Sequence, residues 1–217
     1  MGYLVGMDEA LPPSGQSTFE LSGGDLCLDF VNTWGDRGRS DTDGLQTYAQ
    51  LLAFARQTGL LDSQTEGELT AQARVETSAA SAATQAARNL REALYGIFSA
   101  RAHDRGIPGQ ALECLNRALQ EALPNLCLSL QGEALVWHWQ RGGRALTSPL
   151  WPIARAAADL LTGESAAPVR ECGGAACTWL FLDHSRGRSR RWCSMASCGN
   201  RAKARRHYHR GRQESPA

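Results

Sequence analysis

The chain has 217 residues, a formal net charge of +1 at pH 7 and 42% hydrophobic residues. This length can bury a substantial core and leaves room for one mid-sized domain plus a small appendage. No stretch approaches the ~20 apolar residues of a membrane span, and the first residues lack the basic and apolar regions of a secretion signal. We therefore expect a cytoplasmic protein with no membrane-embedded part.

The charges are unevenly distributed along the chain. Residues 170–217 contain eleven Lys and Arg against three Asp and Glu, whereas residues 1–169 contain twelve against nineteen. The C-terminal part thus carries +8 and the remainder −7. Such asymmetry indicates a polyanion-binding module joined to an ordinary acidic domain.

After a short strand expected at 18–21, a helix is predicted to begin near Asp25. Asp25, Asp29, Asn32 and Asp36 share one face of it, at i, i+4, i+7 and i+11. Aligned carboxylates can bind a metal or an amine, which makes Asp29 and Asn32 candidate ligand-binding residues. The alternative is a solvated face, or side chains that cap neighbouring backbone.

Helical periodicity continues to residue 123, with apolar residues repeating at three- and four-residue intervals. The predicted helices begin at Thr42 or Asp43, at a Ser63 capping box that leads into an Ala-rich stretch ending near residue 103, and at Pro108. The period then changes to two over residues 126–130 and 135–139, which predicts a hairpin. A last helix of this domain runs from Ser148 to Gly163.

Trp137 and Trp139 alternate on the second strand of that hairpin. They are candidates for an aromatic wall that binds a ligand. The alternative is cross-strand packing against the helices. The chain has no Walker loop, GxGxxG, GxSxG or HExxH motif, so we expect no enzyme.

Four cysteines near the C-terminus have metal-ligand spacing. Cys172 and Cys177 form a CxxxxC pair around two glycines, and after fifteen residues Cys193 and Cys198 form another. Thiolates in this arrangement favour Zn(II) in a tetrahedral site. His184, His207 and His209 are alternative ligands, but four cysteines make them unnecessary.

The segment around these cysteines is predicted to fold as a hairpin followed by a helix. Strand character at 179–182 and 190–193 flanks the turn HSRGRS, and the chain after Cys198 is helical in pattern. This resembles a treble clef, whose metal supplies much of the folding free energy. The predicted fold is therefore α+β, with a mainly helical domain at 18–165 and a zinc module at 166–212. Zinc removal is expected to melt the module alone.

Basic residues cluster on the turn and the helix of this module. Those expected to contact nucleic acid are Arg186, Arg188, Arg190, Arg191, Arg201, Lys203, Arg205, Arg206 and Arg210. Guanidinium groups bind phosphate and guanine edges in bidentate fashion. Arg201 has two interpretations, since it can brace the zinc site or contact phosphate. The partner is expected to be DNA, with RNA or an acidic protein as alternatives.

The Cys-Gly-Asn-Arg tetrapeptide at Cys198–Arg201 with its four-cysteine spacing closely resembles the CGNR zinc finger, and GGDLCLDFVNTW at 23–34 is similar to the ABATE domain that usually precedes it. This resemblance would cover nearly the whole chain. It implies a bacterial, stress-linked transcription regulator with a zinc-dependent DNA-binding module. The helical domain would then sense a small-molecule effector or form a homodimer.

Overall fold

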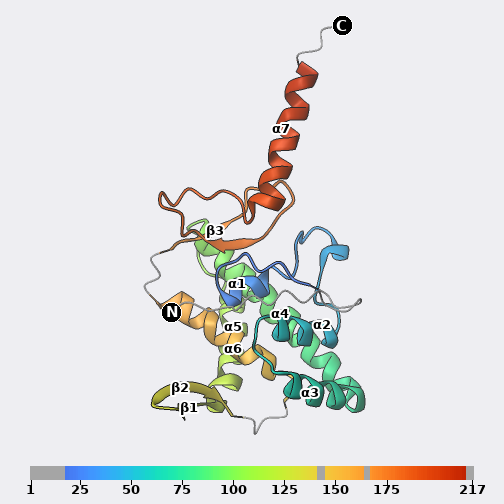
Figure 1. Cartoon of the computed structure of the whole chain (residues 1–217), viewed down its shortest axis with the longest axis vertical. Coiled ribbons are helices and arrows are strands. Elements are labelled where there is room, and N and C mark those ends of the chain that lie inside the picture. Colours follow the sequence, from blue (N-terminus) through green and yellow to red (C-terminus); the bar gives the residue numbers. More distant parts are fainter. Residues whose placement is uncertain (1–17, 141–144, 164–166, 214–217) are drawn as a thin grey trace.

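The computed structural model describes residues 18–140, 145–163 and 167–213 (Figure 1). Its helices are α1 (Leu26–Val31), α2 (Tyr48–Gln57), α3 (Ser63–Val75), α4 (Thr77–Ala102), α5 (Gly109–Ala122), α6 (Trp151–Thr162) and α7 (Asn200–Gln213). Two antiparallel hairpins complete the α+β fold, β1 (Leu126–Gln131) with β2 (Ala134–Trp139) and β3 (Val169–Glu171) with β4 (Leu180–Leu182). Short helical turns lie at η1 (Ser40–Thr42), η2 (Leu123–Asn125), η3 (Ser148–Leu150) and η4 (Met195–Gly199).

Helix α4 is the centre of the helical domain. It contacts α1, α2, α3 and α5, and α6 packs on α1 and α5. Its inward stripe is buried and consists of Leu90, Leu94, Ile97 and Phe98. The Ala-rich stretch is two helices that meet at Glu76, which caps the end of α3 and the start of α4. The small alanines Ala80, Ala83 and Ala87 let the neighbouring helices approach closely.

Helix starts differ from the sequence expectation where a better cap lies nearby. Helix α2 begins at Tyr48 rather than after Thr42 or Asp43, because Thr47 and Gln50 form a capping box there. Asp43 instead forms a buried ion pair with Arg91, whose two terminal nitrogens lie 2.6 and 3.0 Å from its carboxylate oxygens. Burial opposes ionisation of Asp43, but the Arg91 hydrogen bonds hold its pKa below the usual value.

The segment before α1 forms no strand in the described part of the chain. Gln57 on α2 accepts a hydrogen bond from the Phe19 N–H and donates one to the Phe19 carbonyl, at 2.8 and 2.7 Å. A side chain thus takes the place of a strand partner. Among the residues that the structure describes, no helix is long and apolar enough to cross a membrane.

The zinc module does not pair its strands as expected. Strand β4 pairs with β3 in the register Val169↔Leu182 and Glu171↔Leu180, not with residues 190–193. The turn after β4 is closed by Asp183, whose carboxylate accepts hydrogen bonds from the Ser185 and Arg190 N–H groups at 3.0 Å each. Hydrogen bonds to the Asp183 side chain therefore hold this turn in place of the expected backbone pairing between strands.

The two predicted units share one core. Leu180 and Leu182 on β4 are buried in the same hydrophobic cluster as the helices, whereas Phe181, pointing the other way, is buried against the cysteines. Strand alternation thus gives β4 one face for each unit. The zinc module therefore packs against the helical domain through a shared core and is not joined to it by the linker alone.

Candidate metal centre and basic surface

The structure brings the four predicted cysteines together. One ligand atom from each of Cys172, Cys177, Cys193 and Cys198 lies within 4.8 Å of the others. Cys172 follows β3, Cys177 precedes β4, Cys193 lies in the loop after β4, and Cys198 lies in η4, directly before α7. Four convergent thiols fit tetrahedral Zn(II), which would bind to all four as thiolates.

Glycine is required in the loop between the first two cysteines. A Cβ on Gly174 would lie 3.1 Å from the Cys198 sulfur and 3.0 Å from the Cys177 Cβ, inside the ligand cluster. The Gly173 N–H donates to the Arg191 carbonyl at 2.9 Å, which ties this loop to the one that carries Cys193. The Gly-Gly pair therefore lets the loop turn tightly and lets its backbone lie close to the ligand cysteines.

Hydrogen-bond donors point at the sulfur atoms. The Cys193 N–H lies 3.3 Å from the Cys172 sulfur, and the Arg201 guanidinium lies 3.2 Å from the Cys198 sulfur. Hydrogen bonds among the thiols lower the pKa of Cys172 and raise the pKa values of Cys177 and Cys193, so binding of Zn(II) would have to release protons from the latter two. The Cys198 charge raises the pKa of Arg201. This geometry favours the interpretation in which Arg201 braces the zinc site, although its side chain remains exposed.

Arg190 is held within the fold. Its guanidinium donates to the carbonyls of Trp192 at 2.9 Å, of Ser22 at 3.3 Å and of Cys193. It also stacks over the Phe181 ring at 4.3 Å. These contacts leave Arg190 poorly placed for a nucleic-acid partner, unlike the sequence expectation, and make it a clamp on the Cys193 loop.

Asn32 and Asp29, the candidate ligand-binding residues, bond to backbone. Asn32 is buried; its amide donates to the Leu180 carbonyl and accepts from the Leu180 N–H, both at 2.8 Å. Asp29 accepts from the Gly23 N–H at 2.7 Å, and burial raises its pKa to about 6. These contacts correspond to the capping alternative rather than to a ligand site.

Further bonds dock the zinc module onto the helices, and sequence analysis missed them. Arg37 donates to Thr178 at 2.9 Å and to Glu92 on α4 at 3.0 Å. The Glu171 carboxylate accepts from Tyr95 at 2.9 Å and from Ser99 at 2.8 Å. Tyr95 and Ser99 lie one turn apart on α4, but nothing in the sequence indicates which distant carboxylate they meet.

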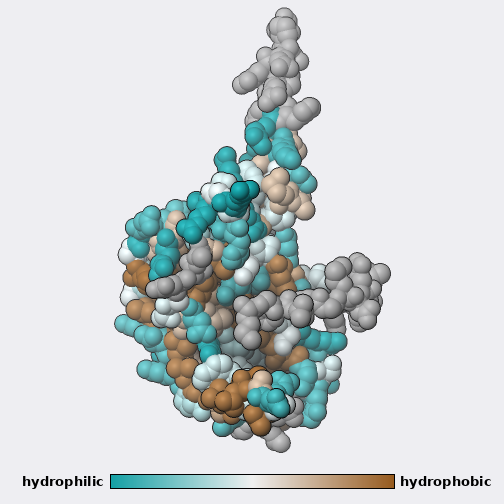
Figure 2. Space-filling model, turned by 60° about the vertical axis from the view of Figure 1, so that its left-hand side comes forward, coloured by the Kyte–Doolittle hydropathy of each residue, from teal (hydrophilic) through white to brown (hydrophobic). Residues whose placement is uncertain are grey.

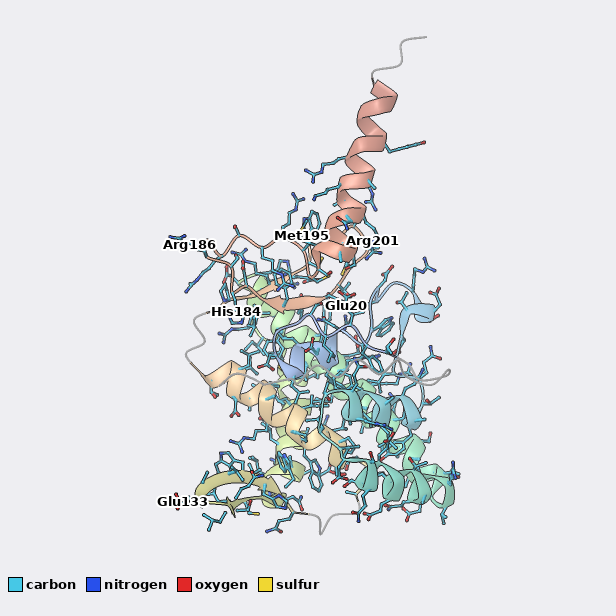
Figure 3. All side chains as sticks on the ribbon, in the orientation of Figure 1. Glu20, Glu133, His184, Arg186, Met195 and Arg201 are labelled. Atoms are coloured by element: carbon cyan, nitrogen blue, oxygen red, sulfur yellow. The ribbon has the colours of Figure 1, made fainter. Side chains whose placement is uncertain are left out.

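The remaining predicted basic residues lie on two elements around the metal centre. Arg186, Arg188 and Arg191 are exposed in the loop after β4, and Lys203, Arg205 and Arg206 are exposed on α7. Figure 3 shows Arg201 at the base of α7 and Arg186 at the outer turn, with α7 extending away from the body. Arg210 lies on α7, but its side chain is outside the described residues.

A cleft of about 550 Å³ runs beside the metal centre. One wall is basic and comprises Arg191, Arg201, Arg205 and Arg206. The opposite wall belongs to the helical domain and includes Gly35, Asp36 and Arg39. The metal centre therefore lies where the first turns of α7 meet the loop that follows α1.

The predicted tryptophans lie elsewhere. Trp137 and Trp139 line a separate groove of about 850 Å³ between β2 and α3. Trp139 packs on Trp151 with ring centroids 6.0 Å apart, and Arg155 lies over the Trp137 ring at 4.3 Å. They are not brought together with Asp29 and Asn32, so the four candidates form no common site.

These features define a zinc-finger protein in which a helical domain and a four-cysteine module share a core. A model of the ABATE family, described as "Putative stress-induced transcription regulator", matches residues 24–164. A model of the CGNR zinc finger matches residues 169–211. The chain belongs to the ABATE family, and its C-terminal module is a CGNR zinc finger that holds zinc. No curated protein matches the chain.

Proposed function

We propose that this protein is a zinc-dependent, DNA-binding transcription regulator without enzymatic activity. The observation that carries the proposal is the position of α7. This helix begins two residues after the ligand Cys198 and extends away from the body, with exposed Lys203, Arg205 and Arg206 on its surface (Figures 1 and 3).

The physical properties of α7 suit a DNA groove. A helix is narrow enough for the major groove, which is about 12 Å wide. No ion pair within the described residues neutralises Lys203, Arg205 or Arg206. Their charge is available to phosphate, which supplies most of the sequence-independent affinity for DNA.

Zinc would act here by fixing the direction of α7. Cys198 holds the base of this helix to the other three cysteines, and Cys172 and Cys177 lie in the loop that joins β3 to β4, a strand buried in the helical core. The metal thus links α7 to the body through covalent ligands. The exposed loop that carries Arg186 and Arg188 belongs to the same module as α7 and would contact the DNA backbone.

The helical domain would modulate this binding, by sensing a small-molecule effector or by dimerising. The groove lined by Trp137 and Trp139 is the best effector candidate, because its volume of about 850 Å³ lies in the range of small-molecule sites. Ligand-induced shifts in the melting temperature of the zinc-loaded protein would identify an effector.

The experiment that tests the proposal is selection of bound sequences from random duplex DNA and random RNA pools by the zinc-loaded protein. Enrichment of a duplex DNA motif supports a DNA-binding regulator. Preferential enrichment of RNA would support the RNA-binding alternative, and failure to bind either pool at low salt would assign the basic surface to an acidic protein partner.

A further inference from the structure

The β1–β2 hairpin exposes an apolar face to solvent. Leu128 pairs with Trp137 and Leu130 with Leu135, so these four side chains lie on one side of the sheet. Their exposed fractions are 54% for Leu128, 59% for Trp137, 71% for Leu130 and 68% for Leu135. Figure 2 shows hydrophobic surface gathered at this lower end of the molecule.

Among the residues that the structure describes, the other elements cover only the base of this face. At the base Trp139 packs on Trp151 of α6, and one turn further along α6 Arg155 stacks on Trp137. Leu130 and Leu135, nearest the turn, are the most exposed of the four. The alternative of cross-strand packing against helices thus accounts for Trp139 but not for the outer half of the hairpin.

An uncovered face of this kind is unusual on a monomer. A two-stranded sheet is at best marginally stable unless it packs against something, and contiguous exposed apolar patches typically mark interaction sites. The hairpin carries four large apolar side chains where a monomer would carry polar ones. The described part of the chain therefore presents an apolar surface of the kind that binds a partner.

We propose that this face binds the same face of a second copy of the chain. The six residues on it, Leu126, Leu128, Leu130, Leu135, Trp137 and Trp139, include no charged side chain, so the face is complementary to itself. A two-fold axis places identical patches against each other. At its edge Arg155 stacks over Trp137, and its Nε lies 3.3 Å from the Asp159 carboxylate one turn further along α6, so each copy brings both charges to the rim.

The size of the face suits a dimer of moderate affinity. Four such side chains expose roughly 400 Å² of apolar surface per copy. A standard interface buries about 800 Å² per partner, with an apolar centre and a polar rim. The hairpin would supply the centre, and α6 the rim. Association should therefore depend on protein concentration.

The location of this face has a consequence for DNA binding, which rests on the function proposed above. The hairpin and α7 lie at opposite ends of the longest axis of the molecule (Figure 1). A dimer joined through its hairpins would hold its two α7 helices far apart. Such a dimer would bridge two separate DNA segments rather than bind half-sites one helical turn apart.

The test measures the mass of the full-length, zinc-loaded protein by analytical ultracentrifugation over a range of concentrations. The wild type should shift from monomer to dimer. Leu135→Glu and Leu135→Lys should each remain monomeric, because either charge would be buried in an apolar interface. Ile107→Glu, between α4 and α5, is the control, since Ile107 is an exposed apolar residue (41%) that lies outside the face.

A wild type that stays monomeric, or a Leu135→Glu or Leu135→Lys variant that still dimerises, would overturn the proposal. Unchanged helical circular dichroism and zinc content exclude misfolding. A bridging assay, in which one immobilised duplex captures a second labelled duplex, separates this inference from DNA binding itself. Leu135→Glu should abolish capture while keeping binding to a single duplex, and a loss of both would instead reflect damage to the DNA-binding unit.

Discussion

The Asn32 side chain forms two hydrogen bonds, each 2.8 Å long, with the backbone of Leu180, a residue 148 positions away in the chain. Its amide acts as a short strand partner for β4, at the point where β4 passes between the metal centre and the helical core. The sequence motif at 23–34 thus supports the zinc module. This relationship explains how two family regions act as one body.

Replacement of Asn32 by Ala should lower the free energy of unfolding by about 2–4 kcal/mol, because it leaves a buried N–H and a buried carbonyl without partners. Urea unfolding followed by circular dichroism measures the change. Asn116→Ala, on the exposed side of α5, is the matched control. A loss below about 0.5 kcal/mol for Asn32→Ala, as expected for an ordinary surface substitution, would show that the bonds are dispensable.

Zinc should be present at one ion per chain, and its removal should destabilise both parts of the protein. The sequence alone predicts that only the C-terminal module melts. The structure predicts otherwise, because Leu180 and Leu182 belong to the core of the helical domain. Elemental analysis gives the stoichiometry, and a melt followed by helical circular dichroism with and without chelator gives the coupling. A helical melting temperature that is indifferent to chelator would mean independent units.

Cysteine variants provide the matched comparison for this metal. Cys193→Ser combined with Cys198→Ser should eliminate stoichiometric zinc, since two of the four ligands are lost. Cys114→Ser, on α5, should retain it. Full zinc retention in the double variant would remove the four-cysteine site from consideration.

The sequence allowed prediction of what is local, and failed where partners are distant. The ligand set of Cys172, Cys177, Cys193 and Cys198 follows from spacing, and the helices follow from apolar periodicity. The pairing of β4 with β3 could not be predicted, because three-residue strands carry too little pattern to show whether residues 169–171 or 190–193 are the partner strand. Likewise, the Asn32 side chain, expected on a helix face but found at the C-cap of α1, gives no indication in the sequence that its partner is a backbone 148 residues away.

Stability should also show a pH dependence that Asp29 contributes. Its pKa in the folded state is raised by burial to about 6, above the ~3.9 of an unfolded chain. The folded state thus favours the protonated form, and its contribution to stability is complete below pH ~4 and lost as the pH rises through about 6. The loss is at most about 3 kcal/mol.

Asp29→Asn isolates this effect, because the amide oxygen can still accept from the Gly23 N–H. The difference in unfolding free energy between variant and wild type should grow in favour of the variant between pH 4 and pH 7. Urea titrations at a series of pH values measure it. A constant difference across that range would place the Asp29 pKa at its ordinary value.

Arg201 should affect zinc as well as DNA. Arg201→Ala removes the guanidinium that lies 3.2 Å from the Cys198 sulfur, so the affinity for zinc should fall, by roughly 10-fold on the scale of outer-shell partners. Competition with a chromogenic chelator measures this. Arg186→Ala, at the outer turn, should weaken DNA binding but leave the zinc affinity unchanged. Equal zinc affinities in both variants would reassign Arg201 to phosphate alone.

The salt dependence of DNA binding should reveal which basic residues contact phosphate. Of the nine basic residues expected to contact nucleic acid, Arg190 is bound to backbone carbonyls, Arg201 lies against the Cys198 sulfur and Arg191 stacks on Trp192. That leaves Arg186, Arg188, Lys203, Arg205, Arg206 and Arg210, so the slope of log K against log salt for duplex DNA should be about −5.4, from about −0.9 per phosphate. Fluorescence anisotropy at increasing salt measures this slope.

Arg205→Ala combined with Arg206→Ala should reduce the magnitude of the slope by about 2, and weaken binding to all duplexes alike if both residues contact phosphate. If either residue instead reads guanine, the loss should be about 1–3 kcal/mol and confined to the preferred sequence. Arg117→Ala, exposed on α5, is the charge-matched control and should change neither slope nor affinity. An unchanged slope in the double variant would show that α7 does not lie on the DNA.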